Sequence, residues 1–284
     1  MASDTTITRF APSPSGLLHA GHAYSALFAE HAAQRDSGRL LLRIEDIDFT
    51  RCRSEYEDAI YEDLTWLGLE WEKPVRRQSE HLDEYTAAIE KLRQRGLIYP
   101  CFCTRKDILA EIEQAGAAPH GPGELLYPGI CRELSYDERE SRIEDGEEFA
   151  LRLDLEKALE ATAEKELIWH DRQKGPQKTQ AELLGDAVLA RKDIQTSYHL
   201  AVVLDDALQK ISLITRGRDL FDATHLHRLL QALLELPVPE YEHHSLITDS
   251  EGTRMAKRKK SPTLRDLRES GQNAQDLRKS LIDW

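Results

Sequence analysis

Long apolar runs and abundant cysteine are missing from this sequence. Its longest apolar stretches, LLYPGI and HLAVVL, are far shorter than the roughly 20 residues that cross a bilayer, so we expect no membrane span. The N-terminus has no charged segment followed by an apolar run, so we expect no signal peptide and a cytoplasmic location. The 4 cysteines, two of them in one Cys-x-Cys, favour a thiol or metal role over disulfide bonds.

Positive charge is also scarce, because 38 lysines and arginines face 51 aspartates and glutamates and the formal net charge is -13. Phosphate backbones normally bind basic surfaces, so this balance at first argues against a nucleic-acid partner. The excess is local, however: residues 45–90 hold 14 acidic and 5 basic side chains, whereas residues 254–284 hold 4 acidic and 9 basic ones. Net charge therefore excludes no such partner. A chain of 284 residues that is 40% hydrophobic is typical of one large or two modest domains.

The first 44 residues follow the pattern of a βαβ unit. Residues 6–11 are rich in β-branched and aromatic side chains and predict a strand. From Ala20, apolar residues recur every three or four positions and predict a helix with Gly38 as its C-terminal cap. Residues 39–44, RLLLRI, predict a strand buried on both faces. This unit favours an α/β fold built on a doubly wound parallel sheet.

The rest of the chain continues this pattern with one interruption. Ser54 and Glu57 predict a capping box that begins a helix ending at Gly68. Residues 99–131 have little helical period and predict a loop-rich insertion. The remaining predicted elements are a helix over 79–96, a strand over 148–155, a polar loop over 171–180, a buried strand over 210–217, a helix over 223–235 and a polar C-terminal helix or tail after residue 260.

The most informative segment is RFAPSPSGLLHAGH, residues 9–22, at the turn from the first strand into the first helix. His19 and His22 lie where unpaired backbone N–H groups and the positive end of the helix dipole favour phosphate. Gly21 allows a ring or phosphate to approach the backbone closely. The two histidines are able to donate hydrogen bonds to phosphate oxygens as charge develops there. The alternative interpretation is a chance pair of surface histidines.

Motifs at five places resemble the class I glutamyl-tRNA synthetases. The segment above matches their HIGH-type signature, and LLRIEDID matches their RIEDTD-type strand. The similarity continues through SYHLAVVLDD, ITRGRDL and RMAKR, in order along nearly the whole chain. It is greatest to a short paralogue family, the glutamyl-Q tRNA(Asp) synthetases. The resemblance implies a Rossmann-type catalytic core with a small zinc-containing insertion and a helical C-terminal segment.

The resemblance also implies domain boundaries. It places the first half of the nucleotide-binding catalytic domain at residues 1–98 and an inserted zinc-binding subdomain, which contacts the acceptor, at 99–145. The second half of the catalytic domain spans 146–240. Residues 241–284 hold the KMSKS-like loop and the C-terminal helical segment, and no anticodon-binding domain is expected.

The same resemblance implies a glutamate pocket. Glu45 matches the carboxylate that binds the substrate ammonium group, and Tyr198 and Arg216 match positions that complete the pocket. Glutamate carries two carboxylates and one ammonium group, so guanidinium groups and a carboxylate are suitable partners. The alternative interpretation is a solvated acidic turn and an ordinary surface cation. The full set implied for L-glutamate is Arg9, Phe10, Ala11, Pro12, Ser13, Glu45, Tyr198 and Arg216.

ATP contacts are implied for His19, Gly21, His22 and Lys257, with Mg²⁺ accompanying the nucleotide. Lys257 lies in RMAKR, residues 254–258, and matches the lysine that steadies the triphosphate as pyrophosphate leaves. This sequence departs from the KMSKS pattern, because Arg254 replaces the first lysine and Ala256 replaces a serine. By itself, such a basic segment is more often a solvated or nucleic-acid-contacting patch.

Cys101, Cys103 and Cys131 predict one structural Zn²⁺ site in the insertion, and a tetrahedral site needs a fourth ligand. The paralogue family implies Tyr127, whose phenol loses its proton only if the metal lowers its pKa. His120 is chemically the more ordinary ligand and is the alternative. Three reduced cysteines without metal remain a further alternative. Cys52 is interpreted as a free thiol.

The resemblance implies a reaction and its partners. The enzyme activates glutamate with ATP, independently of tRNA, and His19, His22 and Lys257 stabilise the developing charge. It then transfers glutamate to the queuosine base in the anticodon arm of tRNA(Asp), and we expect a monomer. The alternatives are a truncated synthetase that charges the 3′ end of tRNA(Glu), a pantothenate-synthetase-like ligase and a non-catalytic zinc-containing RNA-binding paralogue.

Overall fold

The computed structural model describes residues 5–104, 106–108, 127–180, 185–191, 193–247 and 262–282. Its first sheet is parallel, in the order β1-β2-β3. Helix α1 connects the first two strands, so the predicted βαβ unit is confirmed. The bounds are β1 Ile7–Phe10, α1 Ala20–Arg35, β2 Arg39–Ile44 and β3 Glu72–Arg77.

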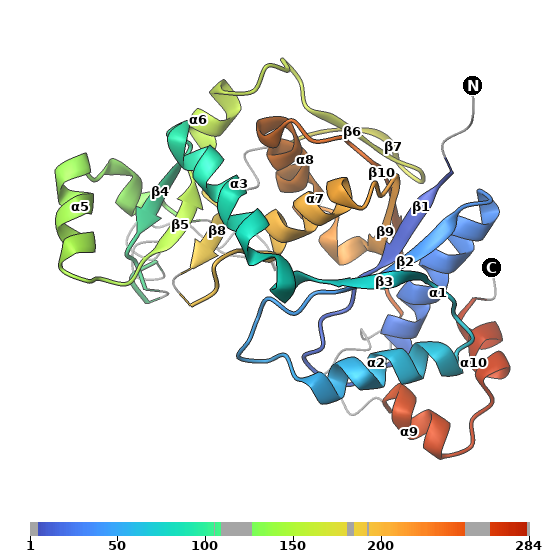
Figure 1. Ribbon diagram of the computed structural model, residues 1–284. Coiled ribbons are helices and arrows are strands. Elements are labelled where there is room, and N and C mark those ends of the chain that lie inside the picture. The colour runs from blue at the N-terminus through green and yellow to red at the C-terminus, as the bar shows by residue number, and fades with distance from the viewer. Residues whose placement is uncertain are drawn as a thin grey trace.

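A second sheet, in the order β7-β6-β10-β9, continues the first one. Strands β9 and β6 both run parallel to β10, and β7 is an antiparallel edge strand. The Ser212 amide donates to the Ile7 carbonyl oxygen at 3.1 Å, which places β9 beside β1. The parallel, doubly wound α/β fold predicted from the sequence is therefore confirmed (Figure 1). The bounds are β6 Ile168–Asp171, β7 Gly175–Lys178, β9 Leu213–Gly217 and β10 Glu240–His244.

Helices pack around these sheets and form two large apolar cores. One core joins β1, β2 and α1 to α2, with Leu264 of α9 fully buried in it. The other joins α3, α7 and α8 to the sheet of the insertion. Figure 1 shows α9 and α10 beside α2, far from the insertion at the opposite side of the molecule. The bounds are α2 Ser54–Trp66, α3 Leu82–Gln94, α7 Tyr198–Leu208, α8 Ala223–Leu234, α9 Leu264–Glu269 and α10 Ala274–Leu281.

The predicted insertion adjoins a small antiparallel sheet in the order β4-β5-β8, whose strands β5 and β8 follow the predicted end of the insertion at residue 145. Helix α5 lies at its outer end in Figure 1, and α6 follows β5. Residues 109–126, which include His120, lie outside the described residues. The domain boundaries inferred from the sequence remain predictions. The bounds are β4 Ile98–Cys101, α5 Tyr136–Glu144, β5 Ala150–Leu153, α6 Leu155–Glu160 and β8 Val188–Arg191.

Three local predictions were wrong. The C-terminal cap of α1 is Asp36, and Gly38 instead lets β2 pass close to β1, because a Cβ there would lie 2.1 Å from the Thr6 carbonyl oxygen. Helix α2 has Arg53 as its N-cap and no side-chain capping bond, so Ser54 and Glu57 form no capping box. Instead, Glu57 accepts from Arg77. The polar segment 171–180 contains β7, which pairs with β6 through the backbone and needs no apolar side chains.

Among the residues described, each helix is too short or too polar to cross a bilayer.

Candidate active site and metal centre

Charged side chains meet where β1, β2 and β9 end. Arg9 of β1 is 5% exposed and donates from Nε to the Asp206 carboxylate of α7 at 2.9 Å. Its Nη1 donates to the Thr215 carbonyl oxygen of β9 at 3.1 Å. Burial opposes ionisation of Asp206, but the charges of Arg9 and Arg43 outweigh it and lower its pKa. Asp206 therefore holds the first predicted substrate-binding arginine in place.

Glu45 belongs to the same charged cluster. Its carboxylate accepts from Arg43 at 3.1 Å, and Arg43 also donates to Asp206 at 2.8 Å. Burial raises the pKa of the Glu45 carboxyl, and the neighbouring cations Arg43 and Arg9 oppose that rise. The Glu45 amide donates to the Pro12 carbonyl oxygen at 3.0 Å, which places the end of β2 against the segment that follows β1. An ammonium group is the kind of ligand that suits a partly buried carboxylate.

Arg216 lies on β9 and is 6% exposed. Its guanidinium group bonds Thr224 and His227 of α8 and His243 of β10, all of them neutral acceptors. Tyr198 begins α7, and its ring centroid lies 5.8 Å from that of His227, one of the partners of Arg216. Burial raises the pKa of the Tyr198 phenol, and the charge of Arg216 opposes that rise. The structure thus brings Arg216 and Tyr198 together, and their role in binding glutamate remains a prediction.

The segment Phe10–Ser13 leads from β1 toward the helix. Phe10 is buried in the core with α1, and the Ser13 hydroxyl lies 3.6 Å from the Cys52 sulfur. Cys52 forms no disulfide, as expected of a free thiol. Asp46 accepts from the Ser79 amide at 2.8 Å, so this carboxylate of the RIEDID segment joins the end of β2 to the turn that follows β3.

His19 and His22 form a capping box at the start of α1. The Gly21 amide donates to His19 Nδ1 at 3.1 Å, and the His19 amide donates to His22 Nδ1 at 3.2 Å. Because both Nδ1 atoms accept hydrogen bonds, each neutral ring carries its proton on Nε2. The centroids of the two rings lie 3.9 Å apart, so both rings present their Nε2 donor groups at one helix N-terminus. This arrangement suits a phosphate.

The basic segment predicted to contact ATP, including Arg254, Ala256 and Lys257, lies outside the described residues. The chain that follows it is anchored at the histidine turn. The Leu264 amide donates to the Leu18 carbonyl oxygen at 2.8 Å, and Thr263 forms a β-bridge with His19. The C-terminal segment therefore returns to the same end of α1.

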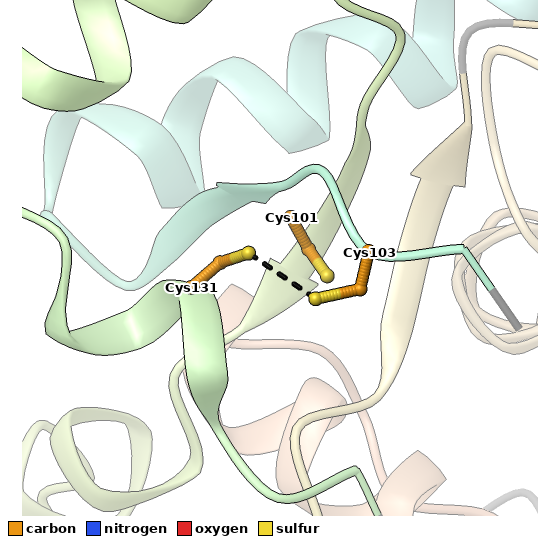
Figure 2. Close-up of side chains that lie close together, drawn as sticks. All are labelled: Cys101, Cys103 and Cys131. Carbon is orange, nitrogen blue, oxygen red and sulfur yellow. Dashed lines mark hydrogen bonds between the residues drawn. The ribbon is translucent and has the colours of Figure 1, made fainter. Parts of the chain in front are cut away.

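Three cysteines of the insertion converge. Figure 2 shows Cys101, Cys103 and Cys131 pointing toward one another, and their sulfur atoms all lie within 4.8 Å of one another. The Tyr127 hydroxyl lies 3.5 Å from the Cys103 sulfur and accepts from the Cys131 amide at 2.8 Å. Burial raises the pKa of the Tyr127 phenol and raises that of Cys103 to about 12.

This donor set fits a tetrahedral zinc ion. Zn–S bonds of about 2.3 Å place tetrahedral sulfur ligands roughly 3.8 Å apart, and the Cys103 and Cys131 sulfurs are 3.4 Å apart. The raised pKa values of Cys103 and Tyr127 mean that a cation must displace the protons of these two groups before they bind it as thiolate and phenolate. The geometry thus brings together the four predicted ligands, Cys101, Cys103, Tyr127 and Cys131, in one buried cluster.

Sequence reasoning missed the residues that hold the site together. Asp206 and Asp205 lie in a motif that was recognised, yet no role was assigned to either carboxylate. Two adjacent acids in the otherwise apolar segment SYHLAVVLDD are a signal, because buried carboxylates need cationic partners. The other unassigned residues of the site are Arg43, Thr215, Thr224, His227 and His243.

Comparisons with known proteins bear on this arrangement. The family model for the catalytic domain of class I tRNA synthetases (E and Q) matches residues 5–283. A glutamyl-Q tRNA(Asp) synthetase of Rhodobacter capsulatus is 46% identical over 96% of this chain and 98% of its own length. Its namesake in Nocardia farcinica is 41% identical over 97% of this chain and 83% of its own length.

A solved structure of a related synthetase has a similar fold. The glutamate-tRNA synthetase of Elizabethkingia anophelis superimposes on 90% of this chain with a TM-score of 0.76 and 28% identity. This chain spans 53% of that synthetase, or about half its length. The family model and the shared fold both cover nearly the whole chain. The chain belongs to the class I tRNA synthetases of the glutamate and glutamine type.

Proposed function

We propose that this enzyme activates L-glutamate with ATP in the absence of tRNA and then transfers glutamate to the queuosine base of tRNA(Asp). The observation that carries the proposal is the charged cluster at the ends of β1, β2 and β9. Arg216 is a buried cation held by neutral groups, and Glu45 is a partly buried carboxylate; the charges of both act on the phenol of Tyr198. An amino acid with two carboxylates matches this distribution better than a neutral one.

In the first step, an oxygen of the α-carboxylate of glutamate attacks the α-phosphorus of ATP. A new C–O–P linkage forms, the bond to the β-phosphate oxygen breaks and pyrophosphate leaves with that electron pair. His19 and His22 donate to phosphate oxygens at the start of α1, and Lys257 steadies the leaving pyrophosphate. Mg²⁺ bound with ATP balances the phosphate charge. The side chains position and stabilise, and none of them acts as a nucleophile.

In the second step, a nucleophilic group of the queuosine base attacks the carbonyl carbon of the adenylate, and AMP leaves. The relative in Rhodobacter capsulatus supports this acceptor, because it is named a glutamyl-Q tRNA(Asp) synthetase. The match covers 96% of this chain and 98% of that protein, so the two have nearly the same extent. The zinc ion, held by the four-residue cluster of the insertion, supports the fold there and takes no part in either step. We expect a monomer with tRNA(Asp) as its nucleic-acid partner.

Glutamate-dependent exchange of labelled pyrophosphate into ATP, measured without tRNA, tests the proposal. We expect exchange with glutamate and much less with aspartate or glutamine at equal concentration. Glu45→Gln is the matched variant, since it keeps the shape but removes the charge that faces the ammonium group. No exchange at saturating glutamate would refute the proposal, and exchange that requires tRNA(Glu) would favour a truncated synthetase instead.

A further inference from the structure

Arg216 differs from the other buried arginines in its partners. Four arginines are buried in the described part of the chain. Arg9 pairs with Asp206, Arg43 pairs with Asp206 and Glu45, and Arg228 pairs with Glu164. Within the same described residues, Arg216 forms no ion pair. A buried cation without an anion is unfavourable, so this group is ready for an anionic ligand.

Neutral side chains take up the hydrogen bonds of Arg216 instead. Its Nε donates to His243 Nε2 at 3.2 Å, and its Nη1 lies 3.1 Å from His227 Nδ1. Its Nη2 donates to the Thr224 hydroxyl oxygen at 2.5 Å. Each nitrogen therefore has one acceptor, and these three acceptors fix the plane of the guanidinium group without compensating its charge.

A second layer fixes the tautomers of both histidines. Because an arginine always donates, His243 must accept on Nε2 and carry its proton on Nδ1, which donates to Asp171 at 2.7 Å. By the same reasoning, His227 accepts on Nδ1 and donates from Nε2 to His199 Nδ1 at 3.1 Å. Burial and the charge of Arg216 lower the pKa of both histidines, to about 4 for His243, so both remain neutral acceptors near pH 7.

We propose that His227 and His243 are positioning residues that hold Arg216 with its charge uncompensated, so that the guanidinium group binds a carboxylate of the substrate. This inference rests on the proposed function, in which that carboxylate belongs to glutamate. Thr224 serves the same purpose at the third nitrogen. Replacing a neutral acceptor with an acid would satisfy Arg216 internally and remove its attraction for substrate.

Paired variants at position 227 test the inference in the glutamate-dependent exchange assay. His227→Leu removes the acceptor and is expected to raise the KM for glutamate roughly tenfold or more, with the KM for ATP within about twofold of the parent. His227→Asn places an amide oxygen where Nδ1 lies, so we expect it to restore most of the affinity. His170, which is half exposed on β6, provides a control: His170→Ala is expected to leave both constants unchanged.

Variants of Thr224 keep the test decisive if His227→Leu fails to fold. Thr224→Val removes the hydroxyl at nearly constant volume, Thr224→Ser retains it, and Thr224→Asp adds a competing carboxylate. We expect the KM for glutamate to rise in the valine and aspartate variants and to stay near the parent value in the serine variant. A folded His227→Leu or Thr224→Val protein with parental KM for glutamate, or with equal rises for glutamate and ATP, refutes the inference while parental exchange upholds the proposed function. A parent protein without glutamate-dependent exchange refutes both.

Discussion

Replacing Asp206 with asparagine is expected to weaken both the fold and glutamate binding. The Asp206 carboxylate accepts from Arg9 at 2.9 Å and from Arg43 at 2.8 Å, and all three side chains are buried. Asparagine keeps one oxygen but turns an amide N–H group toward the second guanidinium. Arg9 then loses its carboxylate partner, whereas Arg43 keeps those of Glu45 and Asp205.

The magnitude follows from the loss of one partner of a buried ion pair, which destabilises proteins by about 3–5 kcal/mol. A domain near the middle of the typical range of ~5–15 kcal/mol remains folded after such a loss. Urea unfolding at pH 7, followed by circular dichroism, measures it. Arg9 loses its anchor in this variant, so we also expect the KM for glutamate in pyrophosphate exchange to rise about tenfold, equivalent to ~1.4 kcal/mol.

Asp205→Asn is the matched control because Asp205 is equally buried on the same helix. Its carboxylate accepts from Arg76 of β3, from Gln78 and from Tyr85 of α3. It also lies 3.7 Å from Arg43 Nε, a longer contact than the 2.8 Å between Arg43 and Asp206. We expect a comparable loss of stability with a KM for glutamate within about threefold of the parent. The reasoning is refuted if Asp206→Asn is as stable as the parent, or if both variants raise the KM equally.

Four other outcomes follow from the structure. Arg216→Ala is expected to weaken glutamate binding far more than ATP binding, and equal losses in calorimetry would contradict the pocket assignment. Metal analysis of the purified protein is expected to give about one zinc per chain, and Cys103→Ser should lower that ratio. Burial raises the pKa of Asp63 to about 6 from its ordinary 3.8, so its charged form destabilises the fold progressively as pH rises from about 4 to 6. Asp63→Asn should therefore increase the unfolding free energy by up to ~3 kcal/mol at pH 8 and by little near pH 4, and equal gains at both pH values would contradict this. Gly38→Ala forces a Cβ toward the Thr6 carbonyl oxygen and should lower stability by about 1–3 kcal/mol in urea unfolding.

The sequence predicts the elements around the site well where periodicity is strong. The strand at 39–44 matches β2 residue for residue, and Ala20 is the first residue of α1. The errors lie at helix ends and in polar strands, where tertiary contacts decide. Gly38 serves the close approach of β1 and β2 and does not cap α1, and no side-chain pattern identifies β7 because backbone pairing alone forms it.

The site was predicted as a set of motifs but not as a network. Arg9 and Asp206 are 197 positions apart, and no local pattern indicates that they pair. The histidines around Arg216 lie on two different elements, and only the packing of α8 against β9 and β10 brings them together. Residue types therefore indicated which ligands to expect, while the fold determined which charges are paired internally and which remain available.

Transfer of labelled glutamate tests the central claim most directly. Purified enzyme is incubated with ATP, labelled glutamate and tRNA(Asp) that either contains or lacks queuosine, with tRNA(Glu) in a parallel reaction. We predict that label is retained only on the queuosine-containing tRNA(Asp). Label on tRNA(Glu), or equal label on both forms of tRNA(Asp), would contradict the proposed acceptor.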